Sequence, residues 1–459
     1  MSAQDPRPAP EPAPASPATP WSATVRRGAD GVLAVGGLPV TALAERYGTP
    51  LYVLDEADLR ARARAFADAF GEAFADLGGG ADVYYAGKAF LSVAVARWVH
   101  AEGLRIDTTT GGELAVALRA GVPGEAIGLH GNNKSDAEIE RALRAGVGRI
   151  VLDSLAEVEQ VAAVAARLGV RAPVMVRVTT GVHAGGHEFI STAHEDQKFG
   201  LSLAGGAARA ALDAVAARPE LDLLGVHSHI GSQILDLAGF EVAARALLAL
   251  RAEIAEQTGR LMPEVDLGGG YGISYTGDVA PPTPHEVAHA LADVVRRACA
   301  DLGTPPPRIS VEPGRAVVGP AGLTLYRVGT VKPVRLDDGA QRRYVSVDGG
   351  MSDNIRTALY DAEYTAALAD HRSTAPLVPA RVVGKHCESG DVVVRDVALP
   401  NDVARGDLLA VPATGAYGRS MASNYNLVPR PGVVAVADGQ ARVLVRRETE
   451  EDLLALDEG

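Results

Sequence analysis

Val83-Tyr84-Tyr85-Ala86-Gly87-Lys88-Ala89-Phe90 joins a short apolar run to a turn that carries one lysine. The following stretch, Leu91 to His100, repeats apolar side chains at helical spacing and predicts a helix. A lysine in a strand-to-helix turn is held in place by the strand and is open to a ligand. On this stretch alone a solvated surface lysine is the simpler interpretation, so the rest of the chain has to decide.

Runs of the same kind alternate with Ala-rich amphipathic stretches from Pro50 onward. Alternating strands and helices imply parallel pairing through crossovers, and eight such units favour a (β/α)8 barrel over an open doubly wound sheet. The eight runs are Val83–Ala86, Leu104–Asp107, Ile127–His130, Ile150–Asp153, Val174–Val178, Leu223–His229, Val265–Leu267 and Ile309–Glu312. Helical stretches between them include Gly112–Ala120, Asp136–Ala145, Leu155–Leu168, Phe240–Gln257 and Pro284–Leu302.

Polar residues stand where these runs end, which is the end of a barrel that carries active sites. Acidic or hydroxyl residues after a strand are often helix N-caps, and we interpret Asp153 and Ser135 in this way. Lys88, His229 and Glu312 are not the usual cap types. We therefore expect these three side chains to gather at one end of the barrel.

Beyond Gly319 the sequence changes to short β-like runs separated by turns, and no long helix fits between most of them. This pattern predicts an all-β second domain. We expect the barrel over residues 50–322 and the β domain over 323–459. We expect a strand and a helix within 25–49 to join the β domain, and residues 1–24 to be a disordered leader. The β-like runs are Leu325–Val331, Tyr344–Val347, Ala380–Val383, Asp391–Val394, Leu408–Val411, Val433–Val436 and Ala441–Val445.

Length and composition limit the possible functions. A chain of 459 residues is too long for one ordinary hydrophobic core, so two domains are expected. A formal charge of −13 argues against a nucleic acid or an anionic membrane as partner. The two cysteines, Cys299 and Cys387, imply no disulfide framework and fit a reducing, cytoplasmic setting. We find no stretch typical of a membrane span, and the Pro/Ala-rich start lacks the features of a secretory signal.

Two loops predict a phosphate site. Gly268, Gly269 and Gly270 follow the seventh run, and Glu312-Pro313-Gly314-Arg315 ends the eighth, the two places where such barrels commonly bind phosphate. With a lysine across the barrel, this suggests pyridoxal phosphate (PLP), with Glu312 facing the ring so that its pyridine nitrogen stays protonated. The alternatives are a simple tight loop of glycines and an ion pair between Glu312 and Arg315.

His227-Ser228-His229 places two histidines on one face of a strand. A metal pair is one interpretation, but the sequence offers no third ligand at a suitable spacing. We prefer His229 as a ring that stacks on the cofactor, Ser232 as a phosphate contact and His227 as a structural residue.

In the second domain, Gly384-Lys385-His386-Cys387-Glu388 sets a thiol among charged groups, where it can act as a general acid or base. Cys299, in a helical stretch, is interpreted as inert. Arg356 and the tyrosines at 360 and 417 lie in polar loops that suit a carboxylate or phosphate. Residues 183–196 do not contain an H-E-x-x-H zinc motif, and we interpret them as a long loop that serves as a lid.

From about Pro50 to the C-terminus the chain resembles the diaminopimelate decarboxylases, a family of alanine racemase-like PLP enzymes, in their actinobacterial form. No single motif decides this, but together they are specific. The motifs are YYAGKAF (84–90), DTTTGGEL (107–114), LHGNNKS (129–135), HEFISTAHEDQKFGLS (187–202), HSHIGSQI (227–234), DLGGGYGISY (266–275), VEPGRA (311–316), DGGMSDNIRTALY (348–360), GKHCESGD (384–391) and ATGAYGRS (413–420).

The resemblance implies a PLP-binding barrel plus a β domain, in a homodimer whose subunits share active sites. It implies that Lys88 forms the Schiff base with PLP, that His229 stacks on the ring and that Cys387, supplied by the partner subunit, donates a proton. The remaining implied cofactor contacts are Ser232, Gly269, Gly270, Glu312, Gly314, Arg315 and Tyr417. The implied substrate contacts are Arg315, Arg356, Tyr360, Glu388 and Tyr417.

The implied reaction is loss of CO2 from the D-configured centre of meso-2,6-diaminopimelate, which gives L-lysine. One alternative is another enzyme on the same scaffold, such as an ornithine, arginine or carboxynorspermidine decarboxylase or an amino-acid racemase. The other is a non-catalytic regulatory homologue, which would be expected to lose the lysine or the thiol. This chain keeps both Lys88 and Cys387.

Overall fold

The structure is a computed structural model that describes residues 18–182 and 198–459. The chain divides into two compact units. The barrel unit comprises Arg62–Gly272 and Pro282–Gly314, and the sheet unit comprises Met1–Ala61, Ile273–Pro281 and Arg315–Gly459. Among the residues described, no helix is both long enough and apolar enough to cross a membrane.

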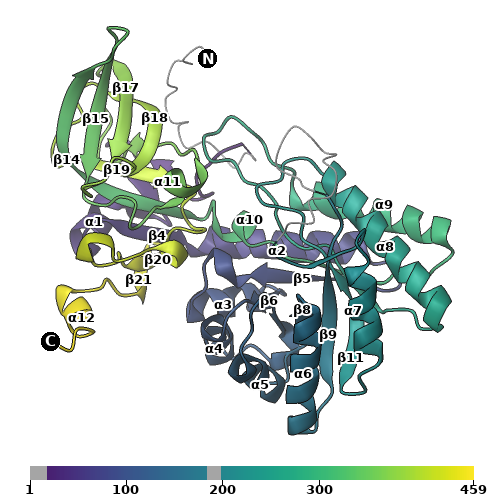
Figure 1. Ribbon diagram of the computed structural model, residues 1–459. Coiled ribbons are helices and arrows are strands. Elements are labelled where there is room, and N and C mark those ends of the chain that lie inside the picture. Colours follow the sequence, from purple (N-terminus) through teal and green to yellow (C-terminus); the bar gives the residue numbers. More distant parts are fainter. Residues whose placement is uncertain (1–17, 183–197) are drawn as a thin grey trace. The chain divides into compact units, whose positions relative to one another are not determined.

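The barrel unit contains a closed ring of eight parallel strands, as the sequence predicted (Figure 1). Each strand pairs with the next one along the chain, and the last pairs with the first, so that the sheet has no open edge between them. A short further strand, β10 (Leu201–Ser202), adds to β9. The ring strands are β5 (Ala81–Ala86), β6 (Arg105–Thr108), β7 (Ile127–Leu129), β8 (Arg149–Leu152), β9 (Ala172–Thr179), β11 (Leu221–His227), β12 (Glu264–Asp266) and β13 (Arg308–Val311).

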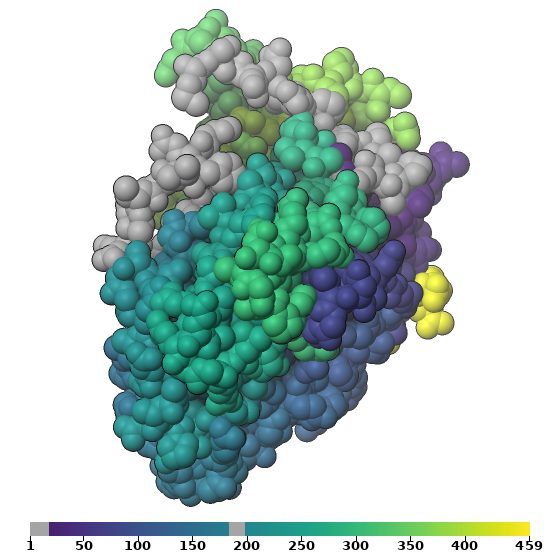
Figure 2. Space-filling model, turned by 90° about the vertical axis from the view of Figure 1, so that its right-hand side faces the viewer, coloured from purple at the N-terminus to yellow at the C-terminus, as the bar shows by residue number. Residues whose placement is uncertain are grey.

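Helices cover the outside of the ring, and α8 and α9 pack side by side on the face that Figure 2 shows in teal and green. Ser135 and Thr283 begin α5 and α9 with capping boxes, in which the side chain of the cap and a glutamate three residues later satisfy each other's backbone N–H groups. The helices are α2 (Glu56–Ala73), α3 (Val93–Ala101), α4 (Gly111–Arg119), α5 (Asp136–Arg144), α6 (Leu155–Leu168), α7 (Ala207–Ala216), α8 (Ala238–Thr258) and α9 (Pro284–Leu302).

The interpretation of Asp153 as a helix cap is wrong. Ser154 is the N-cap of α6 and accepts from the Glu157 amide. Asp153 instead accepts a hydrogen bond from the Gly200 amide at 3.1 Å and lies 3.8 Å from Arg177. The Asp153 carboxylate therefore links the end of β8 to the β9–β10 region. It is available for this contact because Ser154 already caps the helix.

Arg149, the first residue of β8, lies fully buried inside the ring. Its guanidinium pairs with Asp266 at 2.5 Å, donates to Ser310 at 2.8 Å and stacks 3.6 Å from the ring centre of Tyr84. A buried charge is tolerated only when it is paired and hydrogen-bonded. These contacts meet that requirement and join four strands of the barrel interior.

The sheet unit is built on a nine-stranded sheet, which confirms the predicted β domain. Its central strand β14 pairs with β15, β19 and β4. The main path runs β18-β17-β15-β14-β4-β20-β21, and β19 joins β14 to β16. The strands are β4 (Leu51–Asp55), β14 (Gly322–Arg335), β15 (Gln341–Val347), β16 (Ala367–Leu368), β17 (Leu377–Val383), β18 (Val392–Pro400), β19 (Leu408–Pro412), β20 (Val433–Ala437) and β21 (Gln440–Val445).

Short elements complete this unit. A small separate sheet precedes the main one, and its β2 residues share an apolar core with β4, β14 and β20. The elements are β1 (Arg26–Arg27), β2 (Leu33–Val35), β3 (Leu38–Pro39), α1 (Val40–Tyr47), α10 (Arg315–Val318), α11 (Arg356–Tyr360) and α12 (Glu450–Leu454).

The chain's start and its domain limits differ from the expected ranges. Residues 1–17 of the expected leader lie outside the described residues, whereas Trp21 is buried in the apolar core of the sheet unit. Ser22 and Thr24 both donate to the buried Asp55 carboxylate. The expected barrel range of 50–322 also includes β4, which belongs to the sheet unit because it pairs with β14 and β20.

Candidate active site

Side chains that are far apart in sequence meet at the carboxyl ends of the barrel strands. Lys88 lies exposed in a turn of 3-10 helix (Gly87–Ala89) directly after β5. Asp107 and Glu312 are buried at the ends of β6 and β13. Burial raises the pKa of Asp107 to about 7 and also raises the pKa of Glu312, against the opposing charges of Arg149 and Lys88. A lysine and two carboxyl groups of altered acidity thus share one electrostatic environment.

The glycine turn after β12 packs directly on its neighbours. A Cβ on Gly269 would stand 2.3 Å from the Glu312 carbonyl oxygen, and one on Gly270 would stand 2.5 Å from that of Gly231. Any side chain would push these loops apart, so glycine is required here. The Gly269 amide donates to His229 Nδ1 at 3.2 Å, which fixes the ring of that histidine.

Backbone hydrogen bonds hold the Glu312 loop (residues 312–314) to the turns on either side of it. Its amide donates to the Gly268 carbonyl at 3.0 Å, and the Ala86 amide donates to the Pro313 carbonyl at 3.2 Å. A Cβ on Gly314 would lie 2.9 Å from the Ala86 carbonyl oxygen. The lysine turn, the glycine turn and the Glu312 loop therefore form one continuous rim.

Two buried histidines flank Glu312. His227 Nε2 lies 3.0 Å and His130 Nε2 lies 3.5 Å from Glu312 Oε1, and His130 Nε2 is also 3.1 Å from Asp107 Oδ1. Burial lowers the pKa of His130 to about 4 and that of His227 well below its usual range, so both rings are neutral near pH 7. From the sequence we interpret His227 as a structural residue, and nothing in the sequence predicts that it lies near His130.

These barrel-unit residues fit PLP. Glu312 Oε1 is buried and, within the described residues, has no hydrogen-bond partner of good geometry, which suits a protonated ring nitrogen. His229 is half-buried, and burial lowers its pKa well below the usual range, as stacking by a neutral ring requires. The exposed Lys88 amine and the glycine turn supply a nucleophile and a close backbone approach for phosphate. Ser232 lies exposed in the loop after β11.

A second group of predicted residues lies in the sheet unit. Arg315 and Arg356 are both buried, and both donate a hydrogen bond to the hydroxyl of Tyr275. The distance from Arg356 Nη1 to this hydroxyl is 2.8 Å. Arg356 also donates to Tyr364 at 2.5 Å, and the Arg315 guanidinium lies 4.7 Å from the Tyr417 ring centre. No carboxylate of the described residues lies within ion-pair distance of Arg356. Such a pair of buried cations is suited to bind an anionic group.

Tyr275 and Tyr364 were not predicted from the sequence. Tyr275 closes the motif DLGGGYGISY, and Tyr364 follows the motif that contains Arg356. Their hydroxyl groups accept hydrogen bonds from the arginines, and these contacts exist only in the folded protein. A tyrosine close in sequence to a predicted arginine was the one available signal for Tyr364, and none pointed to Tyr275.

The structure does not bury the other predicted residues of this unit. Tyr360 is 60% exposed at the end of α11, and Cys387 and Glu388 lie exposed in the loop between β17 and β18. Glu388 contacts only its own loop in the described hydrogen bonds, at Ser389 and Gly390. The predicted lid, residues 183–196, lies outside the described residues.

The base of α11 contains a buried carboxyl group, Asp353. Burial raises its pKa to about 7, against a hydrogen bond from the Gly350 amide at 2.9 Å. The folded protein therefore holds a proton that the unfolded chain has already released above about pH 4. The stability that this proton supplies is fully present below that pH and is lost as the pH rises to about 7.

We predict that Asp353→Asn flattens this pH dependence. In the wild type the free energy of unfolding should fall between pH 4 and pH 7 by up to about 1.4 kcal/mol per pH unit from this group. Urea unfolding at several pH values measures the slope, and Asp338→Asn, in an exposed turn of the same unit, is the control. An unchanged slope in Asp353→Asn would show that another group is responsible.

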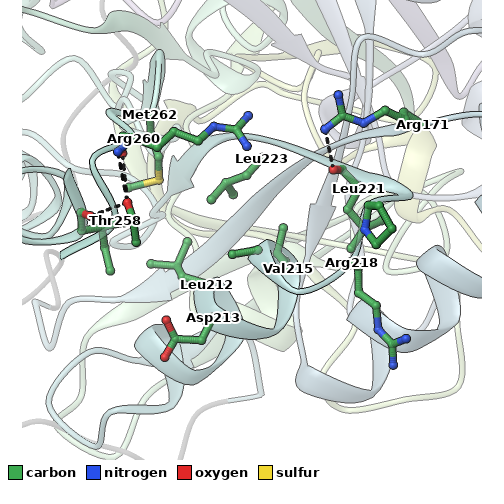
Figure 3. A pocket seen from close by; sticks show the side chains of 13 residues that line it. Arg171, Leu212, Asp213, Val215, Arg218, Leu221, Leu223, Thr258, Arg260 and Met262 are labelled. Atoms are coloured by element: carbon green, nitrogen blue, oxygen red, sulfur yellow. Dashed lines mark hydrogen bonds between the residues drawn. The ribbon is translucent and has the colours of Figure 1, made fainter.

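A cavity of about 270 Å³ lies elsewhere in the barrel unit, at the amino ends of β9 and β11 (Figure 3). Its wall combines apolar side chains, such as Leu212 and Met262, with charged ones, such as Asp213. The arginines around it are already engaged, since Arg171 and Arg260 both lie 3.2 Å from Asp222. Active sites of such barrels form at the opposite, carboxyl ends of the strands, so this cavity is not part of the candidate site.

Comparison with known proteins agrees with this geometry. Residues 56–319 match the model of the pyridoxal-dependent decarboxylase family, pyridoxal binding domain. The chain is 54% identical to the diaminopimelate decarboxylase of Mycobacterium leprae, with 95% of this chain and 92% of that protein covered. It is 45% identical to the Bacillus subtilis enzyme of the same name, with 95% and 97% covered.

A solved structure shares the fold. The crystal structure of diaminopimelate decarboxylase from M. jannaschii in complex with L-lysine superposes with a TM-score of 0.88 at 33% identity, covering 95% of this chain and 98% of that one. The barrel, the lysine turn and the buried glutamate are thus accompanied by high identity along nearly the whole chain. The chain therefore belongs to the diaminopimelate decarboxylase family of PLP-dependent lyases.

Proposed function

We propose that this protein removes CO2 from the D-configured centre of meso-2,6-diaminopimelate and releases L-lysine, the last step of lysine biosynthesis. The observation that carries this proposal is the exposed Lys88 on the same barrel rim as the buried, hydrogen-bond-deficient Glu312, in a chain of this family. PLP, when bound, supplies the electron sink for the electron pair that departing CO2 leaves behind.

The barrel-unit residues hold the cofactor. Lys88 would hold it covalently through Nζ until a substrate amine takes its place. Glu312 would keep the ring nitrogen protonated, and His229 would orient the ring by stacking. We assign the phosphate to the glycine turn and the neighbouring loops of the barrel unit, with Ser232, Gly269, Gly270 and Gly314. Arg315 and Tyr417 are the remaining residues that we assign to the cofactor.

The sheet-unit residues recognise the substrate. The distal end of diaminopimelate carries a carboxylate and an ammonium group, which require opposite charges. Arg315 and Arg356 supply the positive charge, and Glu388 supplies the negative charge. Tyr360 and Tyr417 complete the set that we assign to the substrate. This combination would separate diaminopimelate from ornithine and lysine, which lack the distal carboxylate.

Arg356→Gln tests the carboxylate assignment. A hydrogen bond to a charged group contributes about 1.5–3 kcal/mol, so we expect kcat/KM for diaminopimelate to fall about 10- to 100-fold, mainly through KM. The visible absorbance of bound PLP should not change. Arg335→Gln, an exposed arginine at the end of β14, is the matched control. An unchanged KM in Arg356→Gln would remove this residue from the substrate site.

Cys387 is proposed as the proton donor to the carbon that loses CO2, supplied across a homodimer. A donor works best when water is excluded, yet this thiol is exposed in the single chain. Exposed apolar side chains accompany it, since Leu427 is 74% and Tyr425 is 42% exposed and the Tyr425 ring lies 5.2 Å from that of His386. A partner subunit that covers this loop would account for both features.

Paired inactive variants test the shared site. Lys88→Ala and Cys387→Ala chains with different tags can be co-expressed and the doubly tagged dimer purified. If each site takes its lysine and thiol from different chains, that dimer has one intact site and about half the wild-type activity. If both groups act within one chain, the mixed dimer has no intact site and stays inactive. Failure to recover any doubly tagged protein would contradict the dimer itself.

A substrate panel tests the reaction. Purified protein with PLP is given meso-diaminopimelate, ornithine, arginine or lysine, and CO2 and amine products are measured. We expect L-lysine from the first substrate only. Decarboxylation of another substrate, or racemisation without CO2, would assign the chain to a different reaction on the same scaffold. A cytoplasmic location remains our expectation, to be checked by fractionating the source cells.

A further inference from the structure

The His130, His227 and Glu312 side chains form a buried cluster whose function the proposed reaction leaves open. Each of the three residues is at most 8% exposed. Their Nε2 and Oε1 atoms all lie within 4.8 Å of one another, and the two rings are edge-to-face at 5.2 Å between centres. Polar atoms this close and this buried are arranged for a ligand or for one another.

The donors near Glu312 are few. Arg149, one of the cations whose charge acts on Glu312, is paired with Asp266 and donates to Ser310. His227 Nε2 is the nearer imidazole nitrogen at 3.0 Å, and His130 Nε2 is divided between Glu312 and Asp107. At these distances hydrogen bonds are possible, but neither ring aligns an N–H with the oxygen in the described structure. A hydrogen bond from His227 Nε2–H to Glu312 would therefore require the ring to turn.

We propose that His227 is a positioning residue for Glu312, whose Nε2–H holds the carboxylate that faces the PLP ring nitrogen. The inference rests on the cofactor role proposed for Glu312. With this hydrogen bond the carboxylate is a weaker base and leaves the proton on the ring. Without it, Glu312 takes that proton, the ring loses its positive charge and it becomes a poorer electron sink. His130, whose Nε2 lies 3.1 Å from Asp107, restricts the movement of the Glu312 carboxylate on its other side.

The same three side chains have the composition of a transition-metal site. The charge around them argues against this use, because the Arg149 guanidinium lies 3.7 Å from Asp107, which is itself next to His130. A divalent ion would also compete with PLP for Glu312. Elemental analysis of purified protein therefore belongs in the test.

The test loads the enzyme with PLP labelled with ¹⁵N at the ring and records the nitrogen resonance, which reports directly on protonation. The variants are His227→Leu, which removes the donor, and His227→Gln, whose amide can replace it. His289→Leu is the control, because His289 lies on α9 and has a buried Nε2 without a hydrogen-bond partner among residues 18–182 and 198–459. Where His227→Leu does not fold, His227→Asn, with an amide too short to reach Oε1, replaces it.

We expect the wild-type and His289→Leu resonances in the protonated range and the His227→Leu resonance displaced toward neutral pyridine. We also expect kcat to fall about 10- to 100-fold with KM within about twofold, because one hydrogen bond to a charged group is lost. His227→Gln should restore the resonance and most of kcat.

An unmoved resonance in folded, PLP-loaded His227→Leu would overturn the inference, and so would a stoichiometric metal that disappears in this variant. Glu312→Gln separates this failure from failure of the cofactor assignment. If the resonance is unchanged in Glu312→Gln, the assignment of Glu312 itself is wrong. If it moves in Glu312→Gln and not in His227→Leu, only the role of His227 fails.

Discussion

Lys88→Ala is expected to abolish turnover and the visible absorbance of bound PLP. Lys88 lies exposed directly after β5, beside Gly314, whereas Lys134 in the loop after β7 is buried and paired with Glu157. Loss of a group that both forms the covalent bond and moves protons should lower kcat by about 10³-fold or more. Steady-state lysine formation and the absorbance spectrum measure the two effects.

The fold should survive this change, because the Lys88 side chain is exposed and no strand or core contact depends on it. Lys332→Ala, an exposed lysine of β14 in the sheet unit, should leave both the spectrum and turnover unchanged. Full turnover by folded Lys88→Ala would refute the covalent role of this residue and with it the mechanism.

Cys387→Ala should have the second largest effect and should act differently. Without its proton donor the enzyme should still bind PLP and lose CO2 slowly, with kcat lower by about 10²- to 10⁴-fold, the usual contribution of a positioned acid. The visible absorbance should stay that of the wild type. Comparing spectrum and kcat therefore distinguishes a proton donor from a cofactor ligand.

Cys299→Ala is the matched control for loss of a thiol. Cys299 is buried in α9, and burial raises its pKa, so it is not suited to proton transfer at neutral pH. Its replacement should cost some stability through lost packing and leave kcat unchanged. If Cys387→Ala behaved like Cys299→Ala, the proton donor would have to be sought elsewhere.

The fold was largely predictable, because short runs rich in apolar residues alternate with amphipathic helical stretches along the barrel. β4 was not predicted as a strand of the sheet unit, since its partners β14 and β20 are hundreds of residues away. The range expected for the leader also included Trp21, whose burial depends on core partners throughout the sheet unit.

The site was predictable where a residue type was unusual for its position. Residues that follow a strand are often helix caps. Lys88, His229 and Glu312 stand at such positions but are not cap types, and for this reason they were predicted as site residues. The approach of His130 and His227 to Glu312 could not be predicted, because it depends on three strands closing into one ring. The sharing of the Tyr275 hydroxyl by two arginines could not be predicted either, because Arg315 and Arg356 are 40 and 81 positions away from it in the chain.

The most direct test of the account uses meso-diaminopimelate labelled with ¹³C in the carboxylate of its D-configured centre. Purified protein with PLP is incubated with this substrate, and labelled CO2 and lysine are measured together. The account predicts that all released CO2 carries the label and that unlabelled L-lysine forms in equal amount. Unlabelled CO2, labelled lysine, or no lysine from protein that shows the PLP spectrum would contradict it.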